Sequence, residues 1–423
     1  ILKGARRDRV EPMEVVETYT RSYFEDMDAL GVVRPDISPR ASAHIPEQIE
    51  LIKTLIEKGH AYEANGSVYF SVASFPDYGK LSGRRIEEEE GGTRAGTPFR
   101  VAPREDKRHP ADFALWKKAE PEHILRWPSP WSWGYPGWHI ECSTMSTKYL
   151  GSPFDIHGGG IDNIFPHNEC EIAQWEAASG QPFARYWMLA GALSIDGVKM
   201  SKSLGNVLNI KDALKRYSPQ AIRFFILSSH YSNPIDFSDA ALEAAAKGVE
   251  RLLGPVRLVR DRLRTAAESA DAAEFANALD EHRAAFVEVM DDNFNAPAGL
   301  GVLSKLTTDV NTLLNSGSPI GRSTLEAIDT TYRDLGGRVL GVIPDAFESD
   351  ADLDVLDGLV RMLIDMRAEA RASKDFARAD AIRQQLAEVG VALEDGRDGT
   401  IWRLTRLGSA AADPYRLYLI CVN

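Results

Sequence analysis

The chain has 423 residues, 44% of them hydrophobic, which is enough for about two to four domains with buried cores. Its net charge of −13 excludes a globally basic protein, so a nucleic-acid partner would need a local basic surface. Three cysteines argue against a disulfide framework and favour a reducing, cytoplasmic setting, and the absence of a long apolar run or signal peptide predicts no membrane association.

The first predicted elements are two helices and a strand. Apolar residues recur at helical spacing over 11–31 and again over 45–59, where the second helix should stop at Gly59. The alternating stretch "GSVYFSV" at 66–72 predicts a strand.

The next part of the chain alternates between strand and helix signals. "WPSPWSWGYPGW" at 127–138 is a loop rich in Trp, Pro and Gly, and "HIEC" leads from it into a helix. "PFDIHGGG" predicts a short strand, and "FPHNECEIAQWEAASG" predicts a helix closed by Gly180. Strands alternating with helices indicate an α/β domain with a parallel sheet.

From about Ser238 the pattern becomes long and amphipathic, which predicts a helical bundle. A last unit, 351–405, predicts two helices followed by a small hairpin in "GVALEDGRDGTIWRL". No role follows from the sequence for the tail 406–423.

A candidate metal site lies in "FPHNECEIAQ" at 165–174. His167 and Glu171 are four positions apart, so on a helix they share one face, with Pro166 suited to its first turn. Such a pair alone usually marks an exposed polar face. Cys142, which follows the aromatic loop, adds a third competent zinc ligand, although most free cysteines are simply small buried residues. The fourth position would be open or filled from elsewhere. Cys170 could also bind a metal, but it should point to another part of the helix face.

A candidate phosphate site lies in "DGVKMSKSLGN" at 196–206. It holds two lysines and two serines within five residues, bounded by Gly197 and Gly205. Cations on such a loop can neutralise the charge of a polyphosphate in a transition state.

These residues carry a resemblance to a known family. Lys199 to Ser203, "KMSKS", is the signature loop of class I aminoacyl-tRNA synthetases. Further stretches, in the same order as in that family, resemble the cysteinyl-tRNA synthetases and cover nearly the whole chain to about Arg403: "FPDYGKLSG" (75–83), "DFALWK" (112–117), "PGWHIECS" (136–143), "FDIHGGG" (154–160), "FPHNECEIAQ" (165–174), "HYSNPIDFS" (230–238), "MDDNFNAP" (290–297) and "LEDGRDGTIWR" (393–403).

The resemblance implies one zinc ion per chain at the floor of the amino-acid pocket, where it binds the thiolate of substrate cysteine. Its ligands would be Cys142, His167 and Glu171, together with a cysteine near the N-terminus of the family's proteins. A soft thiolate gains more on zinc than a hydroxyl does, so the metal would separate cysteine from serine. Trp138 is similar to the tryptophan that packs against the bound cysteine.

The resemblance also implies the ATP site. Lys199 and Lys202 would be the catalytic lysines that stabilise adenylate formation, and the ATP-binding residues would be Ser201, Lys202, Gly159 and Asp162. Cysteine would attack the α-phosphate of ATP, with Mg²⁺, to give cysteinyl-adenylate. The 3′-end hydroxyl of tRNA(Cys) would then accept the cysteinyl group. The expected partners are L-cysteine, ATP and tRNA(Cys), and the expected state is a monomer.

The implied fold class is α/β: a Rossmann-like class I catalytic domain, N-terminally incomplete, followed by an α-helical bundle and a small mixed α/β unit. The catalytic domain would span 1–240, with an insertion at about 45–136 over the tRNA acceptor end. The bundle, 241–345, and the unit 351–405 would bind the anticodon side of the tRNA.

The chain departs from the family pattern at two places. Where the family often has H-H-E-N-E, this chain has His167-Asn168-Glu169-Cys170-Glu171, which keeps both ligand positions. The sequence also begins at Ile1, in the middle of a pattern, and nothing in it matches the family's N-terminal C-x-x-T and H-I-G-H stretches. We therefore expect a missing N-terminal segment that carries a zinc ligand and the histidines that handle ATP.

Two alternatives remain open at this stage. One is a related cysteine ligase that passes activated cysteine to an aminosugar, although "EIAQ" and the extended helical region favour the tRNA enzyme. The other is a non-catalytic fragment that binds tRNA or zinc. The reason to consider it is the expected missing N-terminal segment.

Overall fold

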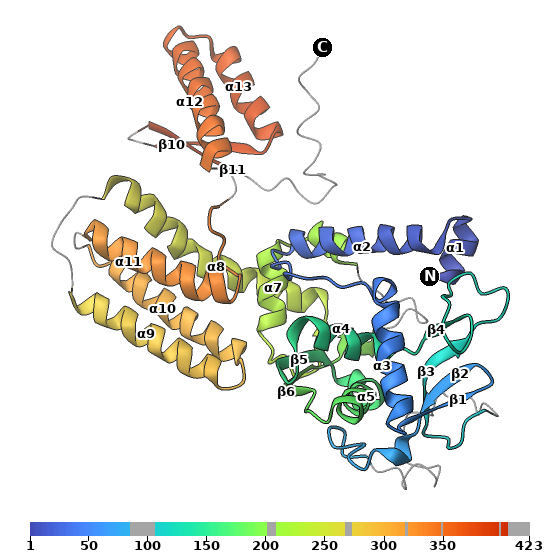
Figure 1. The fold of residues 1–423 in the computed structure, drawn as a ribbon. Coiled ribbons are helices and arrows are strands. Elements are labelled where there is room, and N and C mark those ends of the chain that lie inside the picture. The colour runs from blue at the N-terminus through green and yellow to red at the C-terminus, as the bar shows by residue number, and fades with distance from the viewer. Residues whose placement is uncertain are drawn as a thin grey trace. The chain divides into compact units, whose positions relative to one another are not determined.

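The computed structural model describes residues 1–84, 106–200, 209–266, 273–317, 320–347, 350–396 and 399–404 (Figure 1). The chain divides into two compact units. The first comprises Ile1–Leu252 and Asn277–Thr312, and the second comprises Leu253–Ala276 and Leu313–Asn423.

The predicted early helices are present. The helices up to residue 227 are α1 (Leu2–Asp8), α2 (Pro12–Ala29), α3 (Ile45–Glu57), α4 (Ile140–Leu150), α5 (Glu169–Ser179), α6 (Ile210–Leu214) and α7 (Pro219–Leu227). Helix α2 begins with a proline and a reciprocal capping box between Glu11 and Glu14, as its sequence favours. Helix α3 ends just before Gly59, whose φ of 81° suits glycine.

An antiparallel sheet is built from β1 (Ala61–Ala64), β2 (Ser67–Phe70), β3 (Phe113–Lys118) and β4 (Gly134–Pro136), in that order. The predicted strand at 66–72 corresponds to β2, which is buried along its length. Asn65 and Gly66 both have positive φ, which matches the tight turn that Asn-Gly favours between paired strands.

A parallel pair follows, which confirms the α/β expectation. Strands β5 (Phe154–Gly160) and β6 (Ala184–Ala190) are parallel, and α5 lies between them in the chain. Helices α3, α4 and α5 pack on one another (Figure 1). The core beneath them joins side chains of both sheets and the helices, including Ile52, Trp116, Ile140, Ile172 and Phe183.

A third sheet contains β7 (Leu193–Ile195), β8 (Val198–Lys199) and β9 (Ile235–Phe237), in the order β8-β7-β9. Asp196 and Gly197 form the turn between β7 and β8, again with positive φ at both residues. Nearby, a small core joins the end of α2 to the segment that follows the signature loop, through Leu30, Ala213, Ile222, Phe225 and Leu242.

The long amphipathic stretches are helical, as predicted. They form α8 (Asp239–Thr265), α9 (Ala273–Asp291), α10 (Ala296–Leu314) and α11 (Arg322–Tyr332). Among the described residues, no helix has both the length and the apolar character that crossing a membrane requires.

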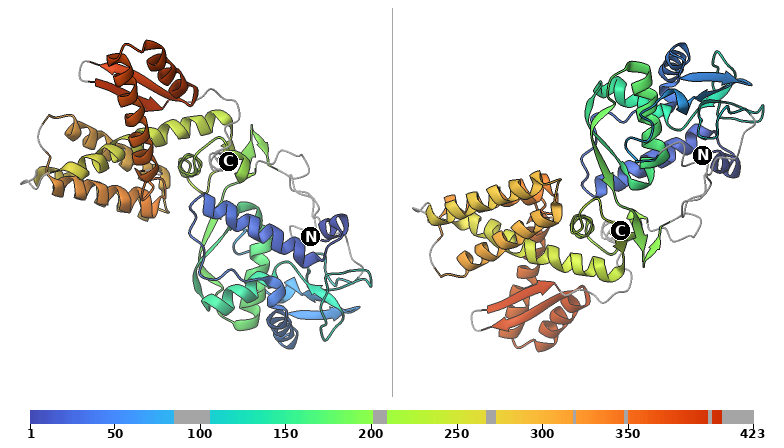
Figure 2. Two further views of the ribbon diagram at one scale, coloured as in Figure 1. Left: turned by 90° about the horizontal axis from the view of Figure 1, so that it is seen from above. Right: turned by 90° about the horizontal axis from the view of Figure 1, so that it is seen from below.

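The C-terminal part of the second unit has the two helices and the hairpin expected for 351–405. These are α12 (Asp350–Ala372), α13 (Phe376–Glu388), β10 (Val391–Gly396) and β11 (Gly399–Leu404). Strands β10 and β11 pair antiparallel beside the two helices, as Figure 2 shows. Their core includes Val360, Ile382, Leu386 and Leu393. The tail 406–423 lies outside the described residues.

Candidate metal centre and active site

Three side chains that the sequence singled out meet in one place. Cys142 lies in the first turn of α4, Glu171 lies in the first turn of α5, and His167 lies just before α5. One ligand atom from each residue lies within 4.8 Å of the others. His167 and Glu171 are buried, and Cys142 is partly exposed.

The backbone around His167 follows the predicted helix from Pro166 onward. The regular hydrogen bonding of α5 begins at Glu169, but within 164–168 only Phe165 has non-helical angles, with φ −133° and ψ 131°. The Phe165–Pro166 peptide bond is cis. His167 and Glu171 therefore lie four positions apart on helical backbone and meet on one face, as predicted. The prediction of a helix closed by Gly180 is confirmed at its C-terminal end, where Gly180 has φ 73°.

The carboxylate of Glu171 is the centre of the cluster. Asn168 Nδ2 donates to its Oε2 at 2.9 Å, and His157 Nε2 lies 2.9 Å from the same oxygen. Its Oε1 lies 3.3 Å from His167 Nε2 but has no hydrogen-bond partner within the described part of the chain. Burial alone would raise the pKa of Glu171, but hydrogen bonding to His157 and the neighbouring imidazole of His167 lower it to about 2, so the carboxylate is charged.

The pKa of the Cys142 thiol is shifted in the opposite direction from that of Glu171. Burial, reinforced by the neighbouring charges of Glu171 and Glu141, raises the pKa of Cys142 to about 12. The thiol therefore stays protonated at neutral pH in the metal-free protein. A bound cation would be needed to stabilise the thiolate, which is the usual coupling between a metal and its cysteine ligand.

Two further histidines belong to this site, and sequence reasoning gave them no role. His139 Nδ1 lies 2.9 Å from His167 Nδ1, and His157 contacts Glu171 while its ring stacks on Trp187 at 4.5 Å. Both residues occur in the quoted motifs "PGWHIECS" and "FDIHGGG". Those motifs were the available signal, but only the packing of α4 and β5 against α5 shows what each ring contacts.

Three other predicted binding residues lie in the described part of the chain: Trp138, Gly159 and Asp162. The ring centroid of Trp138 lies 4.5 Å from that of His167, and Trp138 is 59% exposed, so its indole presents a free face beside the cluster. Gly159 lies at the carboxyl end of β5, and Asp162 lies in the short turn that follows it. The carboxyl ends of parallel strands are where α/β folds bind ligands.

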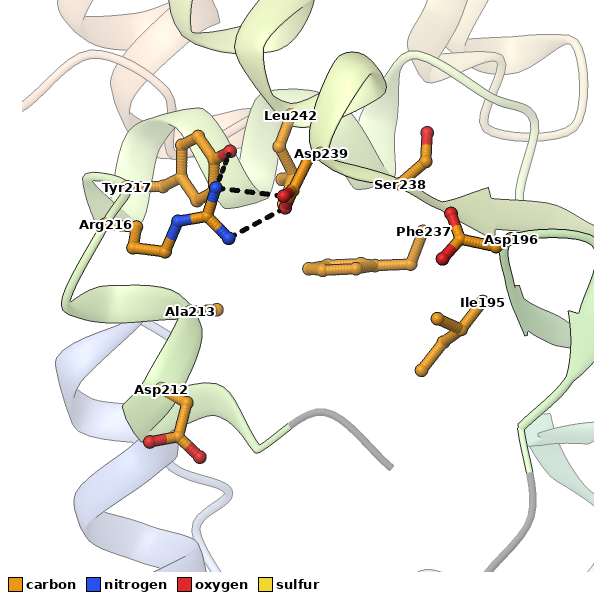
Figure 3. A pocket seen from close by; sticks show the side chains of 10 residues that line it. All are labelled: Ile195, Asp196, Asp212, Ala213, Arg216, Tyr217, Phe237, Ser238, Asp239 and Leu242. Carbon is orange, nitrogen blue, oxygen red and sulfur yellow. Dashed lines mark hydrogen bonds and ion pairs between the residues drawn. The ribbon is translucent and has the colours of Figure 1, made fainter. Parts of the chain in front are cut away.

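The signature loop is described only at its start. Lys199 ends β8, but its side chain, together with Ser201 and Lys202, lies outside the described residues. A hollow of about 210 Å³ lies beside the described residues that flank this loop (Figure 3). Arg216 and Asp239 form a two-pronged ion pair at its edge, with N–O distances of 2.9 and 3.0 Å. Of the predicted site residues whose side chains the structure describes, none lines this hollow.

Cys170 does not join the cluster. Its sulfur is fully buried and lies 3.6 Å from the hydroxyl of Tyr78, which comes from another part of the chain. The expectation that its thiol points away from the Glu171 face agrees with this contact.

Family models match three consecutive parts of the chain. Residues 1–247 match a model described as the tRNA synthetases class I (C) catalytic domain. Residues 285–344 match the DALR domain, and residues 355–403 match the cysteinyl-tRNA ligase anticodon binding domain. The last match favours the tRNA enzyme over the aminosugar ligase.

The chain is similar to curated proteins named cysteine–tRNA ligase. It is 50% identical to that of Deinococcus radiodurans over 407 residues, which cover 94% of this chain and 79% of the relative. It is 47% identical to that of Thermus thermophilus over 407 residues, covering 96% of this chain and 82% of the relative.

Solved structures bear on the fold alone. The methionyl-tRNA synthetase of Mycobacterium tuberculosis, solved with methionyl-adenylate, has a TM-score of 0.57 at 15% identity and covers 82% of both chains. Together with the family models, this confirms the predicted class I α/β fold with helical anticodon-binding domains. The resemblance predicted from the motifs is confirmed, and the chain belongs to the cysteinyl-tRNA synthetase family, whose members are aminoacyl-tRNA ligases.

Proposed function

We propose that this chain activates L-cysteine with ATP and transfers it to tRNA(Cys), and that it selects cysteine through a zinc ion held by Cys142, His167 and Glu171. The observation that carries the proposal is the meeting of a thiol, an imidazole and a buried carboxylate within 4.8 Å. Each of these three groups is a common zinc ligand.

The donor set fits a cation for a further reason. A buried carboxylate oxygen without a hydrogen bond is costly, and Glu171 Oε1 is such an atom within the described residues. It faces the imidazole of His167, and the Cys142 thiol needs a positive partner to lose its proton. A divalent cation between the three groups would satisfy all of them.

A zinc ion bound there would supply a soft Lewis acid to which the thiolate of cysteine binds better than the hydroxyl of serine. The protein side chains then determine how the substrate lies. The exposed face of Trp138, beside His167, offers an apolar surface against which the short cysteine side chain can pack.

For the adenylation step, we propose that Lys199 and Lys202 neutralise the phosphate charge of ATP, supplied with Mg²⁺. Ser201, Gly159 and Asp162 would help to hold the nucleotide. The cysteine carboxylate attacks the α-phosphate and pyrophosphate leaves. The terminal hydroxyl of the tRNA then attacks the activated carbonyl and AMP leaves. Both steps depend on positioning and on stabilisation of charge.

The remaining proposals concern partners and setting. The helical segment 241–345 and the unit 351–405 would bind the anticodon side of tRNA(Cys), which the matches to the DALR and anticodon-binding models support. The segment at about 45–136 would lie near the acceptor end. We also propose that the chain acts as a monomer in the cytoplasm, where its free thiols would stay reduced.

The test is to purify His167→Ala and Glu171→Ala and to measure zinc per chain and the kinetics of cysteine-dependent pyrophosphate exchange. Both variants should hold less zinc, and the KM for cysteine should rise more than that for ATP. Cys170→Ser is the matched control, because a serine hydroxyl can keep the contact with Tyr78. Zinc that remained at one per chain in both ligand variants would refute the assignment.

A second measurement separates the acceptors. The chain is supplied with either tRNA(Cys) or an aminosugar, together with labelled cysteine and ATP, and the labelled product is identified. Transfer to the tRNA is expected, whereas transfer to the aminosugar alone would overturn the proposal.

A further inference from the structure

One motif of the chain has no role in the function described so far. It is "FPDYGKLSG", which opens the loop Phe75–Arg84, here named the brace loop. This loop lies against the segment 165–176, which carries two of the three proposed metal ligands. Two backbone N–H groups of the loop, from Gly79 and Ser82, donate to the two carboxylate oxygens of Glu169, the first at 3.1 Å.

Side-chain contacts extend this attachment along the same segment. The hydroxyl of Tyr78 lies 3.6 Å from Cys170 Sγ, and Lys80 forms an ion pair with Glu176. Two side chains of the brace loop also contact the ring of Phe165. Tyr78 meets it edge to face at 6.4 Å between centroids, and the guanidinium of Arg84 lies 4.3 Å from its centroid.

Glu169 is placed between the ligands but faces away from them. It is fully buried and lies two residues from His167 and two from Glu171, yet it does not join their cluster. Residues two apart on a helix do not share a face, so the carboxylate of Glu169 points to the side where the brace loop lies. A buried carboxyl group must be hydrogen-bonded, and the loop supplies those hydrogen bonds.

The loop is shaped for this contact at Gly79. Its φ is +98°, and a Cβ there would lie 1.8 Å from the carbonyl oxygen of Arg84. Only glycine fits this close approach, which turns the N–H of Gly79 toward Glu169.

The metal-binding segment begins at a break in the backbone. Helical spacing of four residues places His167 beside Glu171. Phe165, two residues before His167, is extended, so the helical stretch that carries both ligands starts abruptly after it. The brace loop contacts Phe165 and Glu169 and so holds this first turn at both of its ends.

We infer that the brace loop fixes the geometry of the metal-binding segment and that Glu169 is a positioning residue for the recognition of cysteine. This inference rests on the proposed function. Glu169 touches neither metal nor substrate. It acts by holding the start of α5, and with it His167 and Glu171, at the distance that a metal ion and a bound thiolate require.

The test uses Glu169→Gln in the full chain. The amide keeps the shape of the side chain but turns one acceptor into a donor that faces a backbone N–H. We expect zinc to be lost to a chelator about tenfold faster or more, as for changes that disturb metal-ligand orientation. The KM for cysteine in pyrophosphate exchange should rise by about tenfold, while that for ATP should stay within about twofold.

Asp112→Asn is the matched control. Asp112 is equally buried, and its described hydrogen bonds come from Tyr62 and from the backbone of Val72 and His109 and not from the metal-binding segment. Both variants should lower the melting temperature, but only Glu169→Gln should release zinc faster. If the two variants lost stability alike and both kept the zinc retention and cysteine KM of the parent, Glu169 would be merely structural and the inference would be wrong.

Arg84→Ala gives a second reading if Glu169→Gln fails to fold. Arg84 is exposed, so its loss should leave the fold intact while removing the contact on Phe165. We expect faster zinc loss and a higher cysteine KM, as for Glu169→Gln. Unchanged values would contradict the inference that the brace loop fixes the metal-binding segment. Failure of the proposed function has a different signature: the parent protein would bind no zinc, or His167→Ala would keep it. Even then, a raised cysteine KM in Glu169→Gln and Arg84→Ala would support the inference, and an unchanged cysteine KM would contradict it.

Discussion

His139 and His167 present the same ring atom to each other: their Nδ1 atoms lie 2.9 Å apart in a buried site. At that distance one ring must donate a proton and the other must accept it. Burial, reinforced by His167, lowers the pKa of His139 to about 3, so His139 is neutral at neutral pH. It can then accept a hydrogen bond from the Nδ1–H of His167, which leaves His167 Nε2 facing Glu171.

We predict that His139→Phe weakens the proposed metal site without removing a ligand. The phenyl ring fills the space, but His167 loses the acceptor that fixes its orientation. Loss of such a partner typically costs about 10- to 100-fold in metal affinity. Zinc competition with a chromogenic chelator measures it. His44→Phe is the control, because His44 is a buried histidine bonded to Tyr149 and to a backbone carbonyl away from the cluster. Equal zinc affinity in the two variants would contradict the prediction.

A second prediction concerns alkaline pH and Tyr62. Burial, with help from the hydrogen bond to Asp112, raises the pKa of Tyr62 to about 12. A raised pKa means that the folded state disfavours the phenolate, so the stabilisation is complete below about pH 10 and is lost as the pH rises toward 12. Tyr62→Phe should cost about 1–2 kcal/mol at pH 7 through the lost hydrogen bond.

The free energy of unfolding in urea, measured from pH 8 to pH 12, checks this. The difference in free energy of unfolding between the parent and Tyr62→Phe should become smaller above about pH 10, by up to about 1.4 kcal/mol per pH unit. A gap that stayed constant to pH 12 would show that Tyr62 titrates alike in the folded and unfolded states.

Much of the site could be predicted because its chemically important residues lie in short sequence motifs. Cys142, His167 and Glu171 were selected from residue type and spacing, and the structure brings them together. The spacing argument also holds, because the residues from Pro166 onward have helical backbone angles and lead into α5 at Glu169. Periodicity did not reveal the extended Phe165 just before this turn.

Residues that contribute through packing between distant segments could not be predicted from the sequence. His157 comes from β5 and contacts the Glu171 carboxylate, and the backbone of Gly79 meets Glu169 across 90 positions of chain. Local pattern fixes which elements form, but these contacts depend on how separate elements pack. For Cys170, the sequence left open whether the thiol binds the metal. In the structure its sulfur contacts the Tyr78 hydroxyl and not the cluster of Cys142, His167 and Glu171.

A third prediction follows from the proposed role of the signature loop. Lys202→Ala should slow adenylate formation by about 100-fold or more, because a cation that stabilises charge in the transition state is lost. Zinc content and the cysteine KM should stay close to those of the parent. Single-turnover formation of cysteinyl-adenylate measures the rate. Lys211→Ala is the control, since Lys211 forms a surface ion pair with Glu25 and should change the rate little. A rate for Lys202→Ala within about twofold of the parent would remove this lysine from the mechanism.

The last prediction concerns the corner between α9 and α10. Asn293 has φ 58°, and its side-chain oxygen accepts a hydrogen bond from the Tyr231 hydroxyl at 2.7 Å. Asparagine tolerates this left-handed backbone better than alanine does, and glycine tolerates it best. Asn293→Ala should therefore lower the free energy of unfolding by about 2 kcal/mol, and Asn293→Gly by about 1 kcal/mol, since glycine loses only the hydrogen bond. Tyr231→Phe should match the glycine variant in urea unfolding. Equal losses in the alanine and glycine variants would mean that the left-handed backbone of Asn293 costs nothing, and the hydrogen bond alone would explain the residue.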